Sequence, residues 1–298
     1  MPIFHPLDPV DETPRAQVRA ASAAIKGTWG TPTAESRRRY DDLLLQTPAA
    51  PGVAFEADTL GGVAGWWCIP PDARADAAIF HVHGGGFSVG TARAYRHFAG
   101  QIAARAQLRA FIPDYRLAPE HPFPAGLDDA HAAYAALVAR YPRVILVGDS
   151  AGGNLVLSLL GARVPQPPRA AIALSPCVDL AQRGDSMRTR ADADPYLSPD
   201  GLAATVRRYF AGAEHDLLDP RVSPLYGDLA GLPPVLIHVG DDEILLDDAL
   251  RYGARHPDCA VHVWAGMPHV FPASVGLFAA SPLALDHIGA FAREHAAR

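Results

Sequence analysis

The stretch that decides the fold reads Val144-Ile145-Leu146-Val147-Gly148-Asp149-Ser150-Ala151-Gly152-Gly153-Asn154. An apolar, β-branched run ends at glycines that flank a serine, and the apolar run over 155–160 is typical of a helix. Gly148, Ser150 and Gly152 fit G-x-S-x-G, in which glycines allow a turn so tight that the serine hydroxyl stands alone at its tip. The pattern predicts strand, sharp turn and helix, with Ser150 as a candidate nucleophile. Taken alone, the pentapeptide fits an ordinary turn with a solvated hydroxyl equally well.

The composition is that of a globular protein with a large core. The chain has 298 residues, of which 49% are hydrophobic and 19% charged, so it is long enough for one large α/β domain or two modest ones. These values differ from those of globally disordered proteins and of fibrous proteins. The formal net charge of -6 and the absence of a long Lys/Arg run provide no surface for phosphate backbones, so we expect no nucleic-acid partner.

The cysteines and the N-terminus indicate the compartment. Cys68, Cys177 and Cys259 are too few and too scattered for a disulfide framework or a CxxC metal site, and are predicted to be small core residues. The first residues lack a basic segment followed by an apolar one, and no apolar run is long enough to span a bilayer. We expect a cytoplasmic protein without stable membrane insertion.

Hydrophobic periodicity divides the chain into a helical start and a catalytic domain. Residues 1–50 hold two amphipathic helical patterns, expected to pack outside the sheet as a cap. Residues 51–298 alternate strands with helices, interrupted at about 180–215 by a second cap segment. Eight strands are predicted, at 53–58, 62–69, 77–82, 109–112, 143–147, 170–174, 234–239 and 260–264. This order predicts an α/β fold with a mostly parallel eight-stranded sheet and helices on both faces.

A reactive serine needs a base, and that base needs an orienting carboxylate. His269 follows the strand at 260–264, and Asp241, Asp242 and Glu243 follow the strand at 234–239, so both groups are available at the carboxyl edge of the sheet. We assign His269 as the base and Asp242 as the acid. In isolation His269 fits a surface residue, and the three acids fit the first turn of the helix that follows.

A glycine-rich loop, His83-Gly84-Gly85-Gly86-Phe87, directly follows the strand at 77–82. Attack on a carbonyl places negative charge on an oxygen, which preorganised amides must meet. We predict that Gly84, Gly85 and Ala151 donate these amides. A phosphate-binding loop would need G-x-G-x-x-G or a GK[ST] ending, and neither is present.

The pair His81 and His83 has a spacing that suits metal ligands. No second cluster supplies the further ligands that a metal needs, so we expect no metal site. His83 is instead expected to hold the glycine loop through ring hydrogen bonds.

Four motifs in this order resemble those of the bacterial hormone-sensitive-lipase-like carboxylesterases. They are the glycine loop at 83–86, the segment Asp114-Tyr115-Arg116-Leu117-Ala118-Pro119-Glu120-His121-Pro122-Phe123-Pro124-Ala125, the serine motif at 148–153, and Met267-Pro268-His269-Val270-Phe271. The resemblance runs from about residue 53 to the C-terminus. It implies an α/β-hydrolase fold and a serine carboxylesterase that hydrolyses short-acyl esters without a cofactor.

Carried onto this sequence, the resemblance implies Ser150 as nucleophile, His269 as base and Asp242 as orienting acid. The acid loop at 240–248 is also similar to that of monoterpene lactone hydrolases, so a lactone or an amide substrate stays an alternative, and a non-catalytic binding protein is a more distant one. A small ester is the expected partner. Relatives often dimerise, and the strand at 260–264, expected at an exposed edge of the sheet, would favour a homodimer.

Overall fold

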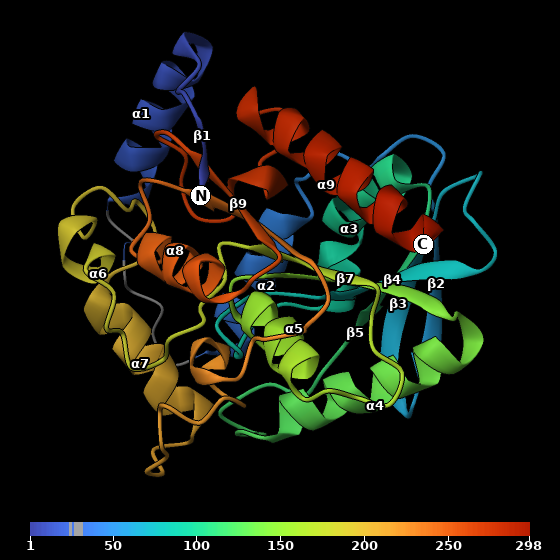
Figure 1. The fold of residues 1–298 in the computed structure, drawn as a ribbon. Helices are drawn as coiled ribbons and strands as arrows, with labels where there is room; N and C mark the ends of the chain where they lie inside the picture. The colour runs from blue at the N-terminus through green and yellow to red at the C-terminus, as the bar shows by residue number, and fades with distance from the viewer. Residues whose placement is uncertain (24–25, 27–31) are drawn as a thin grey trace.

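A nine-stranded, mostly parallel sheet forms the centre of the structure, a computed structural model that describes residues 1–23, 26 and 32–298 (Figure 1). Its order is β1-β9-β8-β7-β6-β4-β5-β3-β2; the β2–β3 and β3–β5 pairs are antiparallel and the other neighbours run parallel. The strands are β1 (Ile3–His5), β2 (Ala54–Leu60), β3 (Val63–Ile69), β4 (Ala77–Val82), β5 (Arg109–Pro113), β6 (Arg143–Asp149), β7 (Ala170–Leu174), β8 (Val235–Gly240) and β9 (Cys259–Trp264). The eight predicted strands are present, with ends shifted by at most two residues.

Helices cover both faces of this sheet, as predicted. Figure 1 shows α3 and α9 on one face and α4, α5 and α8 on the other. The helices are α1 (Glu12–Ser22), α2 (Ala34–Leu44), α3 (Ala92–Ala106), α4 (Ala125–Arg140), α5 (Ala151–Gly161), α6 (Ser186–Thr189), α7 (Pro199–Tyr209), α8 (Leu246–Arg255) and α9 (Ala280–Ala297), with 3-10 turns η1 (Pro9–Asp11), η2 (Pro224–Tyr226) and η3 (Phe271–Ala273).

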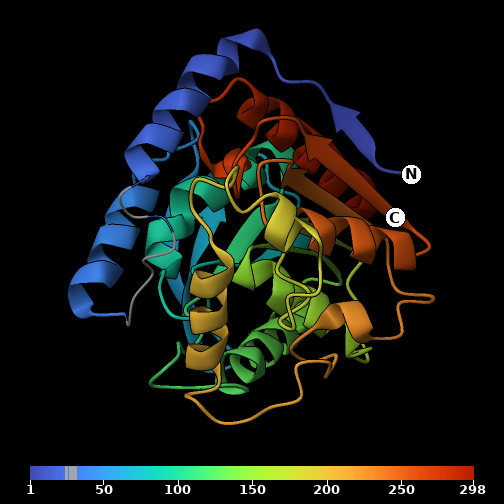
Figure 2. The same ribbon diagram turned by 90° about the vertical axis from the view of Figure 1, so that its left-hand side faces the viewer.

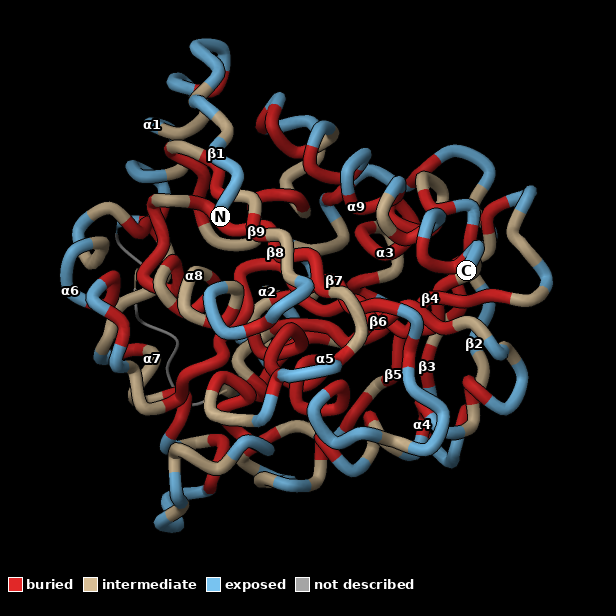
Figure 3. Tube along the Cα trace, in the orientation of Figure 1, coloured by how far each residue is buried: buried red, intermediate tan, exposed pale blue. Residues whose placement is uncertain are grey.

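The central strands are apolar without alternation because both of their faces are covered. Every residue of β4, β7 and β8 is buried, and in β6 only Arg143, at its start, is partly exposed. Figure 3 shows this buried centre inside an exposed outer layer of loops and helix surfaces. The rigid core therefore fixes the positions at which the strands end, and the loops that follow these ends carry the polar side chains of interest.

One prediction about the sheet edge is wrong. The strand at 260–264 is not last in the sheet, because Ile3–His5 pairs with it in parallel as β1. A three-residue strand is too short to show a periodicity, and Ile3 and Phe4 stay 47% and 71% exposed, so no core pattern marks it. The sheet thus has nine strands, and β9 is an inner strand.

The two segments outside the alternating pattern lie near one end of the sheet. Figure 2 shows α1 and α2 along one flank of the molecule. Thr33 caps α2 by accepting a hydrogen bond from the Ser36 amide. Residues 24–25 and 27–31 of the predicted cap segment at 1–50 lie outside the described residues. Within the described ranges, no helix is both long and apolar enough to cross a membrane.

Candidate active site

Ser150 lies at the sharp turn between β6 and α5 that the sequence predicts. Its backbone has φ 52° and ψ −119°, a conformation that is costly for a residue with a side chain. Glycine is required on both sides because a Cβ at Gly148 would lie 2.4 Å from the Gly152 carbonyl oxygen, and one at Gly152 would lie 2.0 Å from the Val82 oxygen. The close packing forces the strained turn, and the turn presents the hydroxyl.

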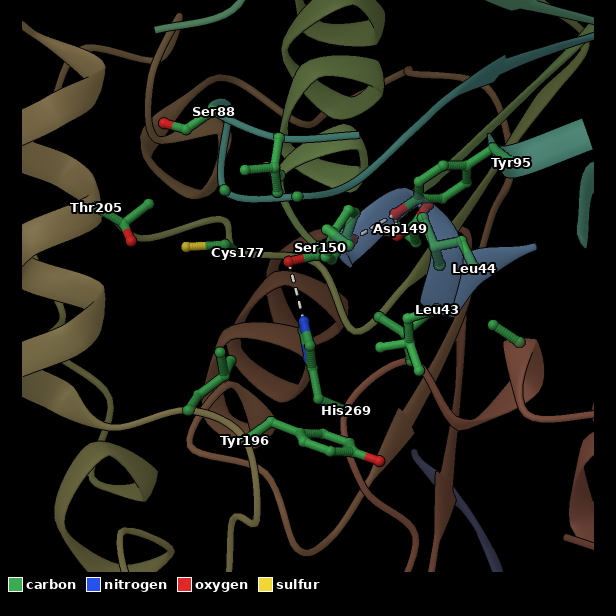
Figure 4. Close-up of a pocket in the computed structure, with 18 of the residues that line it drawn as sticks. Leu43, Leu44, Ser88, Tyr95, Asp149, Ser150, Cys177, Tyr196, Thr205 and His269 are labelled. Atoms are coloured by element: carbon green, nitrogen blue, oxygen red, sulfur yellow. Dashed lines mark hydrogen bonds between the residues drawn. The ribbon is translucent and has the colours of Figure 1, made fainter. Parts of the chain in front are cut away.

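A line of three polar side chains leads from this hydroxyl into the protein. His269 Nε2 lies 2.9 Å from Ser150 Oγ, and His269 Nδ1 lies 2.8 Å from Glu243 Oε2 (Figure 4 shows the Ser150–His269 contact). With the proton on Nδ1, His269 donates to the carboxylate and keeps a lone pair on Nε2 for the serine proton. The three residues follow β6, β9 and β8, so the parallel sheet brings their loops to one edge.

The prediction that Asp242 orients His269 is wrong. Asp242 Oδ2 accepts a hydrogen bond of 2.8 Å from Arg15 Nε and lies 2.6 Å from Arg15 Nη2, so it binds α1. Its neighbour Asp241 accepts from the Gly266 amide at 2.6 Å and ties the end of β8 to the loop after β9. Three adjacent acids therefore hold three different partners, and Glu243 alone among them contacts the histidine ring.

Glu243 is fully buried and is held by donors of its own. Its Oε1 accepts hydrogen bonds from the Gly240 amide at 2.6 Å and from Ser175 Oγ at 2.7 Å. Ser175 Oγ also accepts from the Val270 amide at 3.0 Å, next to His269. Sequence reasoning missed Ser175, although it directly follows β7 and so occupies the same edge as the other polar residues.

The carboxylate controls the protonation of the histidine. Burial disfavours the imidazolium, but the hydrogen bond and charge of Glu243 outweigh burial and raise the pKa of His269 above its ordinary value of 6.5. The pair is therefore suited to hold a proton taken from Ser150.

The glycine loop places its amides differently from the prediction. The Gly84 amide donates to Asp149 Oδ1 at 3.1 Å, so the prediction that it faces a substrate oxygen is wrong. A Cβ at Gly84 would lie 2.2 Å from Asp149 Oδ2, which shows how tightly the loop packs on the serine turn. Gly85, Gly86 and Ala151 line the cavity beside Ser150, and Gly86 is the residue that the sequence analysis did not single out.

His83 fixes this loop from behind, as predicted. Its Nδ1 lies 2.8 Å from the Gly84 carbonyl oxygen, and its ring stacks on Tyr115 with centroids 4.4 Å apart. Tyr115 Oη in turn donates to the His83 carbonyl at 2.9 Å. Burial lowers the pKa of His83, which favours the neutral ring. His81 is fully buried and lies 3.6 Å from Asp149 Oδ1.

A chain of hydroxyl groups connects α2 to the serine turn. Tyr40 Oη and Tyr95 Oη are 2.8 Å apart, and Tyr95 donates to Asp149 Oδ2 at 3.0 Å. Burial and the nearby Asp149 raise the pKa of Tyr95 well above 10, so its hydroxyl stays protonated as a donor. Asp149 therefore joins three elements: the glycine loop, α3 and, through Tyr40, α2.

The hydroxyl of Ser150 opens into a cavity of about 950 Å³. In Figure 4 Thr205, on α7, lies on one side of Ser150, and Leu43 and Leu44, on α2, lie on the other. Tyr196 and His269 lie below the serine in the same view. The cavity is of the size of a small-molecule site.

Comparison with known proteins places this geometry in a family. Residues 79–273 match the family model described as an α/β-hydrolase fold. An esterase of Acinetobacter venetianus is 38% identical over 85% of this chain and 86% of its own. An acetyl-hydrolase of Streptomyces hygroscopicus is 36% identical over 79% of this chain and 81% of its own. A crystal structure of an esterase from the bacterial hormone-sensitive lipase family superposes with a TM-score of 0.88, at 36% identity over 97% of this chain and 99% of that one.

Proposed function

Because this chain belongs to the α/β-hydrolase family, among its bacterial hormone-sensitive-lipase-like carboxylesterases, we propose that it acts through an acyl-enzyme formed on Ser150. Its reaction is the hydrolysis of carboxylic esters. The observation that carries the proposal is the continuous line from Ser150 Oγ through His269 to Glu243, with contacts of 2.9 and 2.8 Å.

The reaction proceeds in two halves. Ser150 Oγ attacks the ester carbonyl while His269 Nε2 takes its proton, and the tetrahedral intermediate collapses as His269 returns that proton to the leaving alkoxide. Water then attacks the acyl carbon while His269 Nε2 takes its proton, which gives a second tetrahedral intermediate. The bond from the acyl carbon to Ser150 Oγ breaks, His269 returns the proton to Oγ, and the carboxylic acid leaves. Glu243 stays ionised throughout, holds the ring orientation and stabilises the imidazolium.

The oxyanion of this intermediate needs donors beside Ser150. We assign the amides of Gly85, Gly86 and Ala151, because these residues line the cavity next to the nucleophile. Gly84 contributes indirectly, because the hydrogen bond from its backbone N–H to Asp149 Oδ1 holds the glycine loop against the serine turn.

Residues 1–50 and about 180–215 form the cap over the site in this proposal. The support is that Leu43 and Leu44 of α2 and Thr205 of α7 line the cavity from outside the sheet domain. Arg37 strengthens the attachment of α2, because its Nε donates to the Ser88 carbonyl at 3.0 Å, beside the glycine loop.

A short acyl group is the preferred substrate portion in this proposal, with an acetyl ester as the first candidate. The acetyl-hydrolase relative supports this choice. The cavity volume of about 950 Å³ also accommodates a larger alcohol portion. Lactones and amides react at the same groups and remain alternative substrates, whereas a protein that only binds would not need the ordered line from Ser150 to Glu243.

The proposed cellular setting is cytoplasmic, in keeping with three unpaired thiols at Cys68, Cys177 and Cys259. A homodimer stays a prediction. Pairing of two copies through an exposed β9 edge no longer supports it, because β1 occupies that edge.

The test combines a substrate panel with a nucleophile variant. We expect p-nitrophenyl esters to be hydrolysed with kcat/KM highest for short acyl chains, and Ser150→Ala to lose about 10⁶-fold in kcat with an unchanged circular dichroism spectrum. A phosphonate probe should label the parent protein at Ser150 and leave the variant unlabelled. Hydrolysis by pure Ser150→Ala above a few per cent of the parent rate would refute the mechanism.

A further inference from the structure

Three histidines from distant parts of the chain meet at the sheet edge formed by β1 and β9. His5 pairs with Trp264 in the parallel ladder, and His262 lies two residues before Trp264, so alternation directs all three side chains to one face. Helix α9 crosses this face (Figure 1) and brings His287 to the other two. The cluster therefore depends on β1, α9 and β9 being assembled.

The ring nitrogens of the three histidines are close enough to share one ion. One nitrogen of each lies within 4.8 Å of the others, and His5 Nε2 is 2.9 Å from His262 Nδ1. On a tetrahedral zinc ion, with bonds of 2.0–2.1 Å, two ligand nitrogens lie about 3.3 Å apart. A tetrahedral site therefore requires ring nitrogens that lie up to 4.8 Å apart to approach to about 3.3 Å, and His287 is the exposed member of the three.

The surroundings of the cluster suit ligation more than plain packing. A hydrogen bond joins His5 to His262, but within the described part of the chain none engages the His287 ring. Beneath them Trp264 Nε1 donates to His238 Nδ1 at 2.9 Å, and the His238 ring stacks on His262 at 4.8 Å, which holds His262 in place. A second cavity of about 520 Å³, lined by His5 and His287, gives solvent access to the rings.

We propose that His5, His262 and His287 bind a divalent zinc ion, with water completing a tetrahedral set. Imidazole is a ligand that zinc and copper prefer, and three histidines plus water form a stable zinc environment. No metal was expected from the sequence, because His81 and His83 lack further ligands; His5, His262 and His287 come from segments that are adjacent only in the fold.

The ion would join the first strand to the last strand and last helix. A ligand that binds only the folded state raises the free energy of unfolding, by ~2.7 kcal/mol when its concentration is 100 times Kd. The site lies apart from the cavity of Ser150, because none of its three histidines lines that cavity. Its effect is therefore expected on stability, with unchanged kcat in saturating ester.

The test uses the full chain without a histidine tag, stripped of metal with a chelator. Calorimetric titration with ZnCl2 should give one equivalent bound, with a rise in Tm, and CoCl2 should give the intense visible absorption of a tetrahedral ion. His287→Gln and His262→Gln should each weaken zinc binding at least tenfold. His121→Gln, at an exposed histidine elsewhere, is the matched control and should bind as the parent does.

A further variant distinguishes the proposed zinc site from other zinc-binding sites on the protein. Zinc binding that is lost in His269→Gln, or kept in both His287→Gln and His262→Gln, would assign the ion to another place and overturn the proposal. No heat and no Tm change with ZnCl2 in the parent protein would overturn it as well. Binding of CuSO4 without ZnCl2 would refute the choice of zinc.

Discussion

Tyr95 Oη donates a hydrogen bond of 3.0 Å to Asp149 Oδ2, one residue before the nucleophile. The other carboxylate oxygen of Asp149 accepts the Gly84 amide, so one side chain holds both the serine turn and the glycine loop. Tyr95 and Asp149 do not meet the substrate's reacting atoms in the proposed mechanism, and we regard both as positioning residues.

Tyr95→Phe removes this donor without changing the ring. We expect kcat to fall about tenfold with KM nearly unchanged, because a lost hydrogen bond to a carboxylate costs about 1.5–3 kcal/mol and loosens the loop that carries the oxyanion donors. Tyr134→Phe is the control, since Tyr134 Oη donates to the Gln166 carbonyl far from the site. Equal losses in both variants, or a loss confined to KM, would contradict the positioning role.

Glu243→Gln should lower kcat by about 10⁴-fold, because a neutral amide no longer fixes the histidine tautomer or stabilises the imidazolium. Asp242→Asn should keep near-parental kcat and lose only the ion pairs with Arg15 and Arg19, a contribution of about 1 kcal/mol or less to the free energy of unfolding. Steady-state kinetics and thermal melts of the two variants decide this. A larger loss of activity in Asp242→Asn would restore the assignment made from sequence.

The pH profile should report the raised pKa of His269. Activity requires the neutral ring, so kcat/KM should rise with pH through an apparent pKa above 6.5. Removing the carboxylate leaves burial as the main influence, and burial favours the neutral ring. The acid limb of the residual activity in Glu243→Gln should therefore move to lower pH; a limb that stays in place would show that Glu243 does not act on His269.

Ser175→Ala removes the hydroxyl that donates to Glu243 and accepts from the Val270 amide. We expect about a tenfold loss in kcat, together with a changed acid limb of the pH profile, since the carboxylate loses a donor. Ser158→Ala is a suitable control, because this buried serine hydroxyl has no hydrogen-bond partner among the described residues. The same kinetic loss in both variants would indicate a general packing effect.

The parts of the fold and site predicted from sequence are those that a strong local pattern marks. Continuous apolar runs mark the central strands. Ser150 and His269 were singled out because each follows such a run within a recognisable loop, and the structure brings the two side chains to 2.9 Å. The acid was misassigned because Asp241, Asp242 and Glu243 are consecutive acidic residues after the same strand, and the sequence does not distinguish among them. Only the fold shows that Glu243 turns back onto the Gly240 amide and reaches His269.

The remaining errors concern partners that are distant in sequence. Gly84 was expected to serve a substrate oxygen, and nothing local indicates that its amide is engaged by Asp149. Strand β1 was missed because three residues, two of them exposed, carry no periodic signal until β9 lies beside them.

The pairing of β1 with β9 also constrains the order in which the sheet can form during synthesis. The ladder joins residues as far apart as Ile3 and His262, so β1 has no ladder partner until β9 has been made as well. At about 5–20 residues per second, that delay is on the order of 10–50 s. During it Ile3 and Phe4 lack the β9 backbone that they pair with in the folded protein, so the β1–β9 edge of the sheet cannot close before β9 has been made.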